Sequence, residues 1–189
     1  VKNELQSANI YDQSETDWLI AGVLEKKRGD LKLLTHIDKN VFKTIKSVVE
    51  KRKKGEPLTK IFGKADFYGI MLKVNEFVLS PRFETELLVD EALKLIGSSK
   101  ARVLDIGTGS GAIAIAVAKN SNAKVTAIDI SSNALDIAKE NASLTGVKIN
   151  FLQGDMFSPL KKEKFDLIIS NPPYIKSSLI DKLDPEVKN

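Results

Sequence analysis

Between residues 102 and 170 the sequence alternates short apolar stretches with turns and helix-like stretches. The apolar stretches are "RVLDIG", "KVTAIDI", "KINFLQGD" and "FDLIIS", and the first two are followed by "GAIAIAVAKN" and "SNALDIAKENASLTG". Short buried strands that alternate with helices are typical of a parallel sheet. The pattern therefore predicts an α/β fold with a Rossmann-like, doubly wound sheet. In such a sheet the fourth strand lies beside the first, across the crevice where ligands bind.

The residues before this sheet follow a different pattern. Apolar residues recur at helical spacing from Lys39 to Lys54, and Gly55 and Pro57 then interrupt the helix. In "DFYGIMLKVNEFVLS" β-forming residues alternate around "VNE", which predicts a hairpin that turns at these three residues. We therefore expect a small helical domain over residues 1–63, a β-hairpin linker over 64–80 and an α/β domain over 81–189.

The composition restricts the possible functions. The 189 residues include no cysteine, which excludes disulfides and thiolate metal sites, and we expect no metal. No apolar stretch is long enough to span a membrane, and "VKNELQSANI" lacks the apolar core of a signal peptide. We therefore expect a soluble, cytoplasmic protein. The net charge is +4, and we interpret the basic run "KRKK" (51–54) as a solvated helix end.

The turn after the first strand of the sheet, "GTGSG", contains Gly107, Gly109 and Gly111. Glycine is needed where the backbone takes unusual dihedral angles or approaches a ligand closely, and the next helix offers free N–H groups at its N-terminus. Asp129 closes the second strand, where its carboxylate can accept hydrogen bonds from both hydroxyls of an adenosine ribose. These features predict a cofactor that contains adenosine.

Two cofactors fit this turn. Gly107, Gly109 and Ala112 satisfy the dinucleotide fingerprint G-x-G-x-x-G/A, which is typical of nicotinamide sites. Such a site commonly opens a domain with its glycine-turn strand, whereas here the helical stretch "TELLVDEALKLI" precedes it. Asp105 lies just before the turn and could face the positive amino group of an amino-acid moiety. Both observations favour S-adenosylmethionine.

The fourth strand ends in "SNPPY", which places Asn171 toward the cofactor crevice. Pro172 and Pro173 keep the backbone extended and provide no N–H groups. The Asn171 side-chain oxygen and a proline carbonyl then form a pair of acceptors, and Tyr174 can lie against a flat group. A planar NH₂ group carries two donors, so this pair can orient its nitrogen toward a methyl group. The motif predicts methyl transfer to an NH₂ group.

The "NPPY" motif behind a glycine turn resembles the amino-methyltransferases, which act on adenine, on guanine in RNA or on glutamine. The segments "GEPLTKIFGKADFYG", "VLSPRFETELLVDEAL" and "NPPYI" resemble, in order and spacing, the release factor glutamine N5-methyltransferase family. The resemblance implies a helical domain, a hairpin linker and a Rossmann-like catalytic domain whose C-terminal strands are missing here. It also implies S-adenosylmethionine-dependent methylation of the glutamine in the Gly-Gly-Gln loop of class 1 peptide chain release factors.

The same resemblance implies which residues form the site. The cofactor residues are Asp105, Gly107, Thr108, Gly109, Ser110, Gly111, Asp129, Asp155, Met156 and Asn171, with Asp155 and Met156 beside the adenine. The substrate residues are Asn171, Pro172, Pro173, Tyr174, Arg82 and Glu86, with Thr85 nearby. The expected catalytic residues are Asn171, Pro172 and Tyr174.

Two other functions would use the same features. A nucleic-acid amino-methyltransferase could hold a flipped base in the same pair of acceptors. A C-terminally incomplete chain could bind the cofactor without catalysing transfer. Of these functions we expect methylation of release factors. The expected partners are therefore release factors, with no membrane contact and no direct nucleic-acid substrate.

Overall fold

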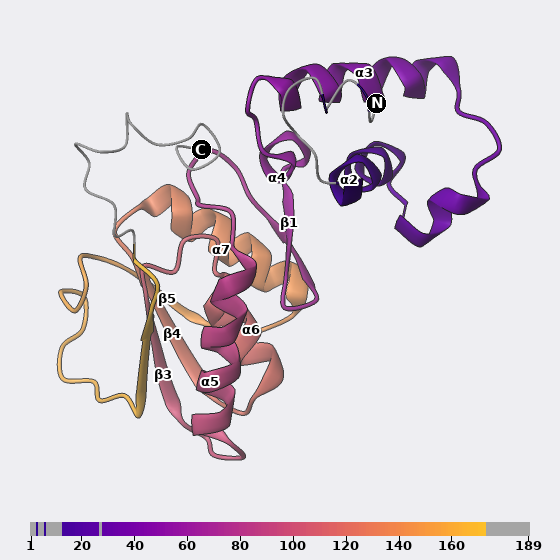
Figure 1. The fold of residues 1–189 in the computed structure, drawn as a ribbon. Coiled ribbons are helices and arrows are strands. Elements are labelled where there is room, and N and C mark those ends of the chain that lie inside the picture. Colours follow the sequence, from indigo (N-terminus) through magenta and orange to yellow (C-terminus); the bar gives the residue numbers. More distant parts are fainter. Residues whose placement is uncertain (1–2, 4–5, 7–12, 27, 173–189) are drawn as a thin grey trace. The chain divides into compact units, whose positions relative to one another are not determined.

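The computed structural model describes residues 3, 6, 13–26 and 28–172, which Figure 1 shows as coloured ribbon. These residues form two compact units, one that ends at Phe62 and one that begins at Gly63. The first unit is helical, and the second contains a hairpin and a four-stranded sheet. All the expected site residues that the structure describes belong to the second unit.

The first unit contains helices α2 (Gln13–Leu24), α3 (Lys39–Lys53) and α4 (Leu58–Phe62), with the 3₁₀ helix η1 (Arg28–Leu33) between α2 and α3. Asp38 caps α3, because its side chain accepts a hydrogen bond from the Asn40 N–H at 2.7 Å. A Cβ on Gly22 would lie 2.5 Å from the Phe62 ring, so α2 and α4 pack in close contact. The buried core of this unit comprises Leu19, Ile45, Val48 and Val49.

The interpretation of the basic run "KRKK" as a solvated helix end is wrong for Arg52. Its side chain is buried and forms an ion pair with Glu15 of α2. Arg52 lies one helical turn after the buried Val48, so the period of α3 places both side chains on the buried face. Lys51 and Lys54 lie off that face and are exposed.

We predict that Arg52→Ala lowers the free energy of unfolding by about 2–4 kcal/mol, because Glu15 would be left largely buried without this partner. Lys51→Ala and Lys54→Ala, as matched controls, should each change it by less than about 0.5 kcal/mol. Urea unfolding of the three variants measures the difference. Small and equal changes in all three would contradict a stabilising buried ion pair.

The second unit begins with an antiparallel hairpin of β1 (Lys64–Phe67) and β2 (Ile70–Lys73). Phe67 pairs with Ile70, which leaves Tyr68 and Gly69 as a two-residue turn with φ values of 54° and 68°. Positive φ at both positions is typical of the type I′ turn, whose twist matches that of the strands. The prediction that the hairpin turns at "VNE" is therefore wrong, because those residues follow β2.

In residues 28–172 the main sheet has four strands, all parallel, in the order β5-β4-β3-β6. They are β3 (Arg102–Ile106), β4 (Lys124–Asp129), β5 (Asn150–Gln153) and β6 (Leu167–Ser170). The predicted α/β class, with the fourth strand beside the first, is confirmed. The chain moves from β3 to β4 on one side and returns to β6 on the other, so the switch point of the sheet lies between β3 and β6.

Helices α5 (Glu86–Ile96), α6 (Ala112–Asn120) and α7 (Ser132–Thr145) pack against one another in this order beside the sheet, and the 3₁₀ helix η2 (Phe83–Thr85) leads into α5 (Figure 1). Ser131 caps α7, because its hydroxyl accepts a hydrogen bond from the Ala134 N–H at 3.2 Å. Helices α5 and α7 end at Gly97 and Gly146, which have φ values of 53° and 72°. The fully buried core residues of this unit include Val89, Val103, Ile115, Val117 and Ala127.

Candidate active site

The carboxyl ends of β3, β4 and β6 bring three predicted features to one edge of the sheet. The glycine turn, defined as residues 107–111, follows β3, Asp129 is the last residue of β4, and Asn171 follows β6. Because β4 and β6 flank β3 with parallel register, the glycine turn lies between the other two features. This is the switch point at which doubly wound sheets bind their ligands.

The glycine turn is anchored to the end of β4 through its backbone. The N–H groups of Gly107 and Thr108 both donate to the Ile128 carbonyl, at 2.9 and 3.0 Å. A Cβ on Gly107 or Gly109 would meet no atom of the described residues within 4 Å, whereas a Cβ on Gly111 would lie 3.0 Å from the Ile115 side chain. The first two glycines therefore leave room for a ligand, and the third is required for packing at the start of α6.

Asp129 links the glycine turn to the start of α7. Its Oδ2 accepts a hydrogen bond from the Gly109 N–H at 2.8 Å, and its Oδ1 accepts one from the Ser131 N–H at 3.0 Å. The side chain is half-buried. Each carboxylate oxygen has capacity for a second hydrogen bond, so Asp129 can hold the turn and still accept from two ribose hydroxyls.

Asp105 lies beneath the glycine turn and is 1% exposed. Its Oδ2 accepts a hydrogen bond from the Thr108 hydroxyl at 2.6 Å, and its Oδ1 has no hydrogen-bond partner within residues 13–26 and 28–172. Burial raises the pKa of Asp105 to about 6; hydrogen bonds from Thr108 and the Ala114 backbone oppose this rise, and the charge of Asp129 adds to it. A buried carboxylate oxygen without a donor fits the ammonium group of an amino-acid moiety.

Asp155 and Met156 lie in the loop after β5. The Gly154 N–H donates to the Asp129 carbonyl at 3.0 Å, which places this loop beside the end of β4. Both Asp155 and Met156 are exposed, and Met156 has a φ of 46°, a conformation that few residues other than glycine adopt. The two residues expected beside an adenine are thus adjacent to Asp129.

Asn171 is exposed at the end of β6, and its side chain has a defined orientation. Its Nδ2 donates to the Thr85 hydroxyl at 3.1 Å, and none of the described residues donates to its Oδ1. The Ser170 hydroxyl donates to the Ile106 carbonyl at 2.9 Å, so the end of β6 is also attached to the end of β3. Pro172 is exposed as well, whereas Pro173 and Tyr174 lie outside the described residues.

Arg82 and Glu86 differ in their surroundings. Glu86 is half-buried, and its Oε1 accepts a hydrogen bond from the Tyr68 N–H at 2.7 Å, so it supports the turn of the hairpin. Arg82 is exposed, and no hydrogen bond or ion pair joins its side chain to another residue in the described part of the chain. Of the two, Arg82 is the one available to a partner.

Asn141 is a buried amide in α7 that contacts the glycine turn, and it is not among the residues expected from the sequence. The signal was present, because Ala138 and Ala142 form an apolar stripe and Asn141 lies on the same face. A polar residue within an apolar stripe needs a hydrogen-bonding partner inside the fold. The sequence does not indicate these partners, because two of the bonds are to the Lys73 backbone in the distant hairpin.

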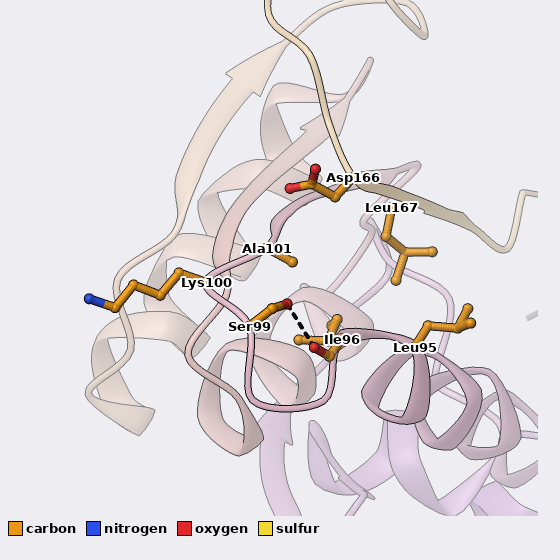
Figure 2. A pocket seen from close by; sticks show the side chains of 7 residues that line it. All are labelled: Leu95, Ile96, Ser99, Lys100, Ala101, Asp166 and Leu167. Atoms are coloured by element: carbon orange, nitrogen blue, oxygen red, sulfur yellow. Dashed lines mark hydrogen bonds between the residues drawn. The ribbon is translucent and has the colours of Figure 1, made fainter.

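A hollow on the surface lies away from this edge of the sheet. Leu95, Ile96, Ser99, Lys100, Ala101, Asp166 and Leu167 line it, as Figure 2 shows. These residues lie at the end of α5, in the loop that leads into β3, and at or just before the start of β6. The hollow therefore lies at the amino ends of the strands. In the same described part of the chain, no cluster of three or more His, Asp or Glu side chains could hold a metal, and no helix is long and apolar enough to cross a membrane.

Comparison with known proteins identifies the family. The methyltransferase small domain family matches residues 83–183. A release factor glutamine methyltransferase of Bacillus cereus is 38% identical over 189 residues, which cover 95% of this chain and 67% of that protein. This chain belongs to the methyltransferase small domain family, among the release factor glutamine methyltransferases. The resemblance recognised in the sequence is thereby confirmed.

Other relatives extend this comparison. The release factor glutamine methyltransferase of Thermodesulfovibrio yellowstonii is 48% identical over 151 residues, which cover 77% of this chain and 54% of that protein. Among solved structures, a ribosomal protein L11 methylase from Lactobacillus delbrueckii subsp. bulgaricus is 32% identical, with a TM-score of 0.47 over 59% of this chain and 58% of that chain. The chain spans 54% to 67% of the length of the two release factor methyltransferases named here.

The buried carboxyl group of Asp105 should make stability depend on pH. Its pKa of about 6 in the folded chain lies above the ordinary 3.8, so the stability that the protonated group contributes is complete below pH 3.8 and is lost as pH rises through 6. Between pH 4 and pH 7.5 the unaltered chain should lose this stability, whereas Asp105→Asn has no carboxyl group to ionise at this position. We therefore predict that the unfolding free energy of Asp105→Asn rises relative to that of the unaltered chain by on the order of 2–3 kcal/mol over this pH range. Urea unfolding without ligand measures this gain. Asp155→Asn, an exposed control, should show none, and parallel pH curves for Asp105→Asn would contradict the prediction.

Proposed function

We propose that this chain binds S-adenosylmethionine and positions the side-chain amide nitrogen of a glutamine for methylation. The proposed substrate is the glutamine of the Gly-Gly-Gln motif in class 1 peptide chain release factors, which places the protein in the cytoplasm. The observation that carries the proposal is the position of Asn171, one strand away from the buried Asp105. The Asn171 Oδ1 accepts no hydrogen bond from any of the described residues. The names of the relatives support the same substrate.

The residues at the carboxyl ends of β3 and β4 fit this cofactor. Asp129 would accept hydrogen bonds from the two ribose hydroxyls, and Gly107 and Gly109 leave room for the cofactor beside the turn. Asp105 Oδ1 would accept a hydrogen bond from the amino group of the methionine moiety. Asp155 and Met156 would flank the adenine. When bound, the cofactor supplies an electrophilic methyl group on a sulfonium.

The Asn171 side chain would hold the substrate amide. Its Oδ1 and the Pro172 carbonyl would accept the two hydrogens of the glutamine NH₂, which directs the nitrogen lone pair at the methyl carbon. Both acceptors would stabilise the positive charge that develops on this nitrogen when it takes the methyl group. The nitrogen then loses a proton to solvent. Pro173, Tyr174 and the exposed Arg82 complete the proposed substrate contacts, with Tyr174 against the flat amide.

The domain organisation remains part of this proposal. We infer a helical domain over residues 1–63, a hairpin linker over 64–80 and a methyltransferase domain over 81–189. The hairpin is bonded to the methyltransferase domain at Glu86, which supports its assignment to the catalytic half of the protein. A nucleic-acid amino-methyltransferase would use the same acceptors, but the family to which the chain belongs favours the protein substrate.

The cofactor assignment can be tested by calorimetry. Asp129→Ala should weaken S-adenosylmethionine binding by about 1.5–3 kcal/mol, because a charged acceptor of the ribose is lost. Asp136→Ala removes an exposed carboxylate from α7 and serves as the matched control, with unchanged affinity expected. Equal affinities for the two variants would remove Asp129 from the site, and tight NADH binding without S-adenosylmethionine binding would overturn the cofactor.

The role of Asn171 can be tested by methyl transfer to purified release factor. Asn171→Ala should lower the transfer rate by roughly 10²–10³-fold while cofactor affinity changes little, because one acceptor that is oriented for the transition state is removed. Asn171→Asp keeps an acceptor of the same shape and should retain more activity than alanine, provided that the Thr85 hydroxyl reverses its hydrogen bond and donates to it.

Two substrate controls separate the alternatives. A release factor in which the glutamine of the Gly-Gly-Gln motif is replaced should accept no methyl group, and DNA and RNA should accept none either. Near-normal transfer by Asn171→Ala would contradict the proposed role of Asn171 in holding the substrate amide. Transfer to nucleic acid instead of release factor would replace the proposed substrate while leaving the cofactor site intact.

A further inference from the structure

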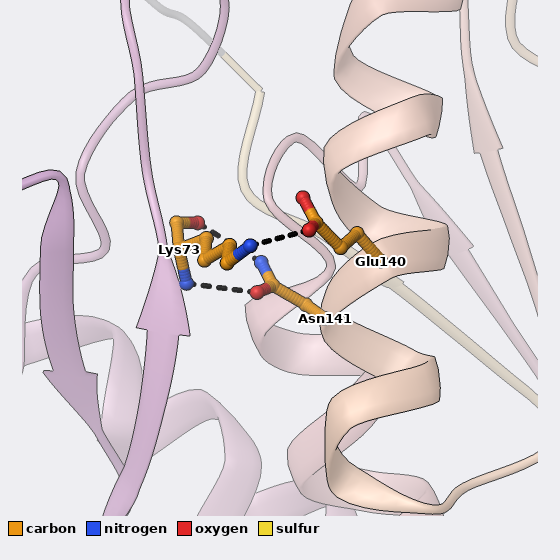
Figure 3. Close-up of polar contacts among 3 residues, drawn as sticks. All are labelled: Lys73, Glu140 and Asn141. Atoms are coloured by element: carbon orange, nitrogen blue, oxygen red, sulfur yellow. Dashed lines mark hydrogen bonds and ion pairs between the residues drawn. The ribbon is translucent and has the colours of Figure 1, made fainter.

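Asn141 is a polar residue in the middle of α7, and it is 1% exposed. Figure 3 shows its side chain directed at β2 of the hairpin. Its Oδ1 accepts a hydrogen bond from the Lys73 N–H at 2.8 Å, and its Nδ2 donates to the Lys73 carbonyl at 2.9 Å. The Asn141 amide thus pairs with the backbone of Lys73 as a neighbouring strand would.

The second N–H of the same Nδ2 donates to the Ser110 carbonyl at 2.9 Å. Ser110 is a buried residue of the glycine turn, between Gly109, whose N–H is bound by Asp129, and Gly111. One planar amide therefore joins the hairpin to the glycine turn. Because the amide group is rigid and both of its N–H groups are used, a shift of the Ser110 carbonyl must also disturb the bonds to Lys73.

We propose that Asn141 is a positioning residue that couples the β1–β2 hairpin to the glycine turn and thereby fixes the turn for cofactor binding. This inference rests on the proposed function, because it takes S-adenosylmethionine as the ligand of the turn. The hairpin is then part of the cofactor site, although none of its residues is expected to touch the cofactor. A ligand that orders the turn must also protect the Lys73 amide from hydrogen exchange.

The adjacent ion pair provides a matched control. Lys73 Nζ pairs with Glu140 Oε1, on the residue before Asn141, and both side chains are about half exposed. This pair joins the same two elements, as Figure 3 shows. Among the described residues Glu140 forms no hydrogen bond with the glycine turn, whereas Asn141 does. A surface ion pair of this kind contributes little to stability. Glu140→Gln should therefore leave both cofactor binding and its effect on the hairpin unchanged.

The test is amide hydrogen exchange, followed by NMR, on the full chain with and without saturating S-adenosylmethionine. In the unaltered chain and in Glu140→Gln, the cofactor should slow exchange of the Lys73 amide by about tenfold, since this amide then opens only when the turn does. Asn141→Ala, measured at a temperature where it is folded, should bind the cofactor about tenfold more weakly. If the alanine variant does not fold, Asn141→Ser can replace it, with a smaller loss of stability. In neither variant should the cofactor protect the Lys73 amide.

The possible failures are distinguishable. If the unaltered chain does not bind S-adenosylmethionine, the proposed function fails, and the inference fails with it. If the unaltered chain binds the cofactor but the Lys73 amide exchanges at the same rate, the coupling is refuted while the proposed function stands. Equal cofactor affinity and equal protection of Lys73 in a folded Asn141 variant would also refute the coupling alone.

Discussion

The attachment of the glycine turn to the end of β4 is the constraint on which the rest of the site depends. Two consecutive N–H groups, of Gly107 and Thr108, share the Ile128 carbonyl, and the next glycine N–H is bound by the Asp129 carboxylate. These bonds require the backbone to turn sharply directly after β3, which explains the positive φ values of Gly107 and Gly109. The same bonds place Asp129 beside the turn, so the two halves of a cofactor site are assembled by the parallel register of two strands.

This attachment also explains why a carboxyl group is kept in an unfavourable place. Asp105 is buried, and its Oδ2 accepts a hydrogen bond from Thr108 in the turn, while its Oδ1 has no partner among the described residues. A residue chosen for stability alone would be apolar here, as its neighbours Val103 and Leu104 are. The buried carboxyl is better explained by a positively charged ligand, whose binding would compensate for the desolvation of the charge.

The sequence was sufficient for features that depend on local pattern, and insufficient for those that depend on distant partners. Strand ends and the positions of Asp129 and Asn171 follow from residues that are close in sequence. Arg52 and Asn141 were missed because each is polar and has its partners in another element, 37 and 68 residues away for Glu15 and Lys73. The hairpin turn was misplaced for another reason: Tyr68 is not a residue that favours positive φ, and the bond from its N–H to Glu86 helps to hold it there.

The hairpin also has contacts on the substrate side of the proposed site. Its turn is bonded through the Tyr68 N–H to Glu86, the first residue of α5, and the preceding residue, Thr85, accepts the hydrogen bond that orients Asn171. Its other end is bonded through Lys73 to Asn141 and so to the glycine turn. A short two-stranded element is weak by itself, but here each end is attached to a different half of the site. Because the proposed transfer requires the cofactor and the substrate amide to be aligned, an element that is bonded toward both proposed sites can set their separation without contacting either ligand.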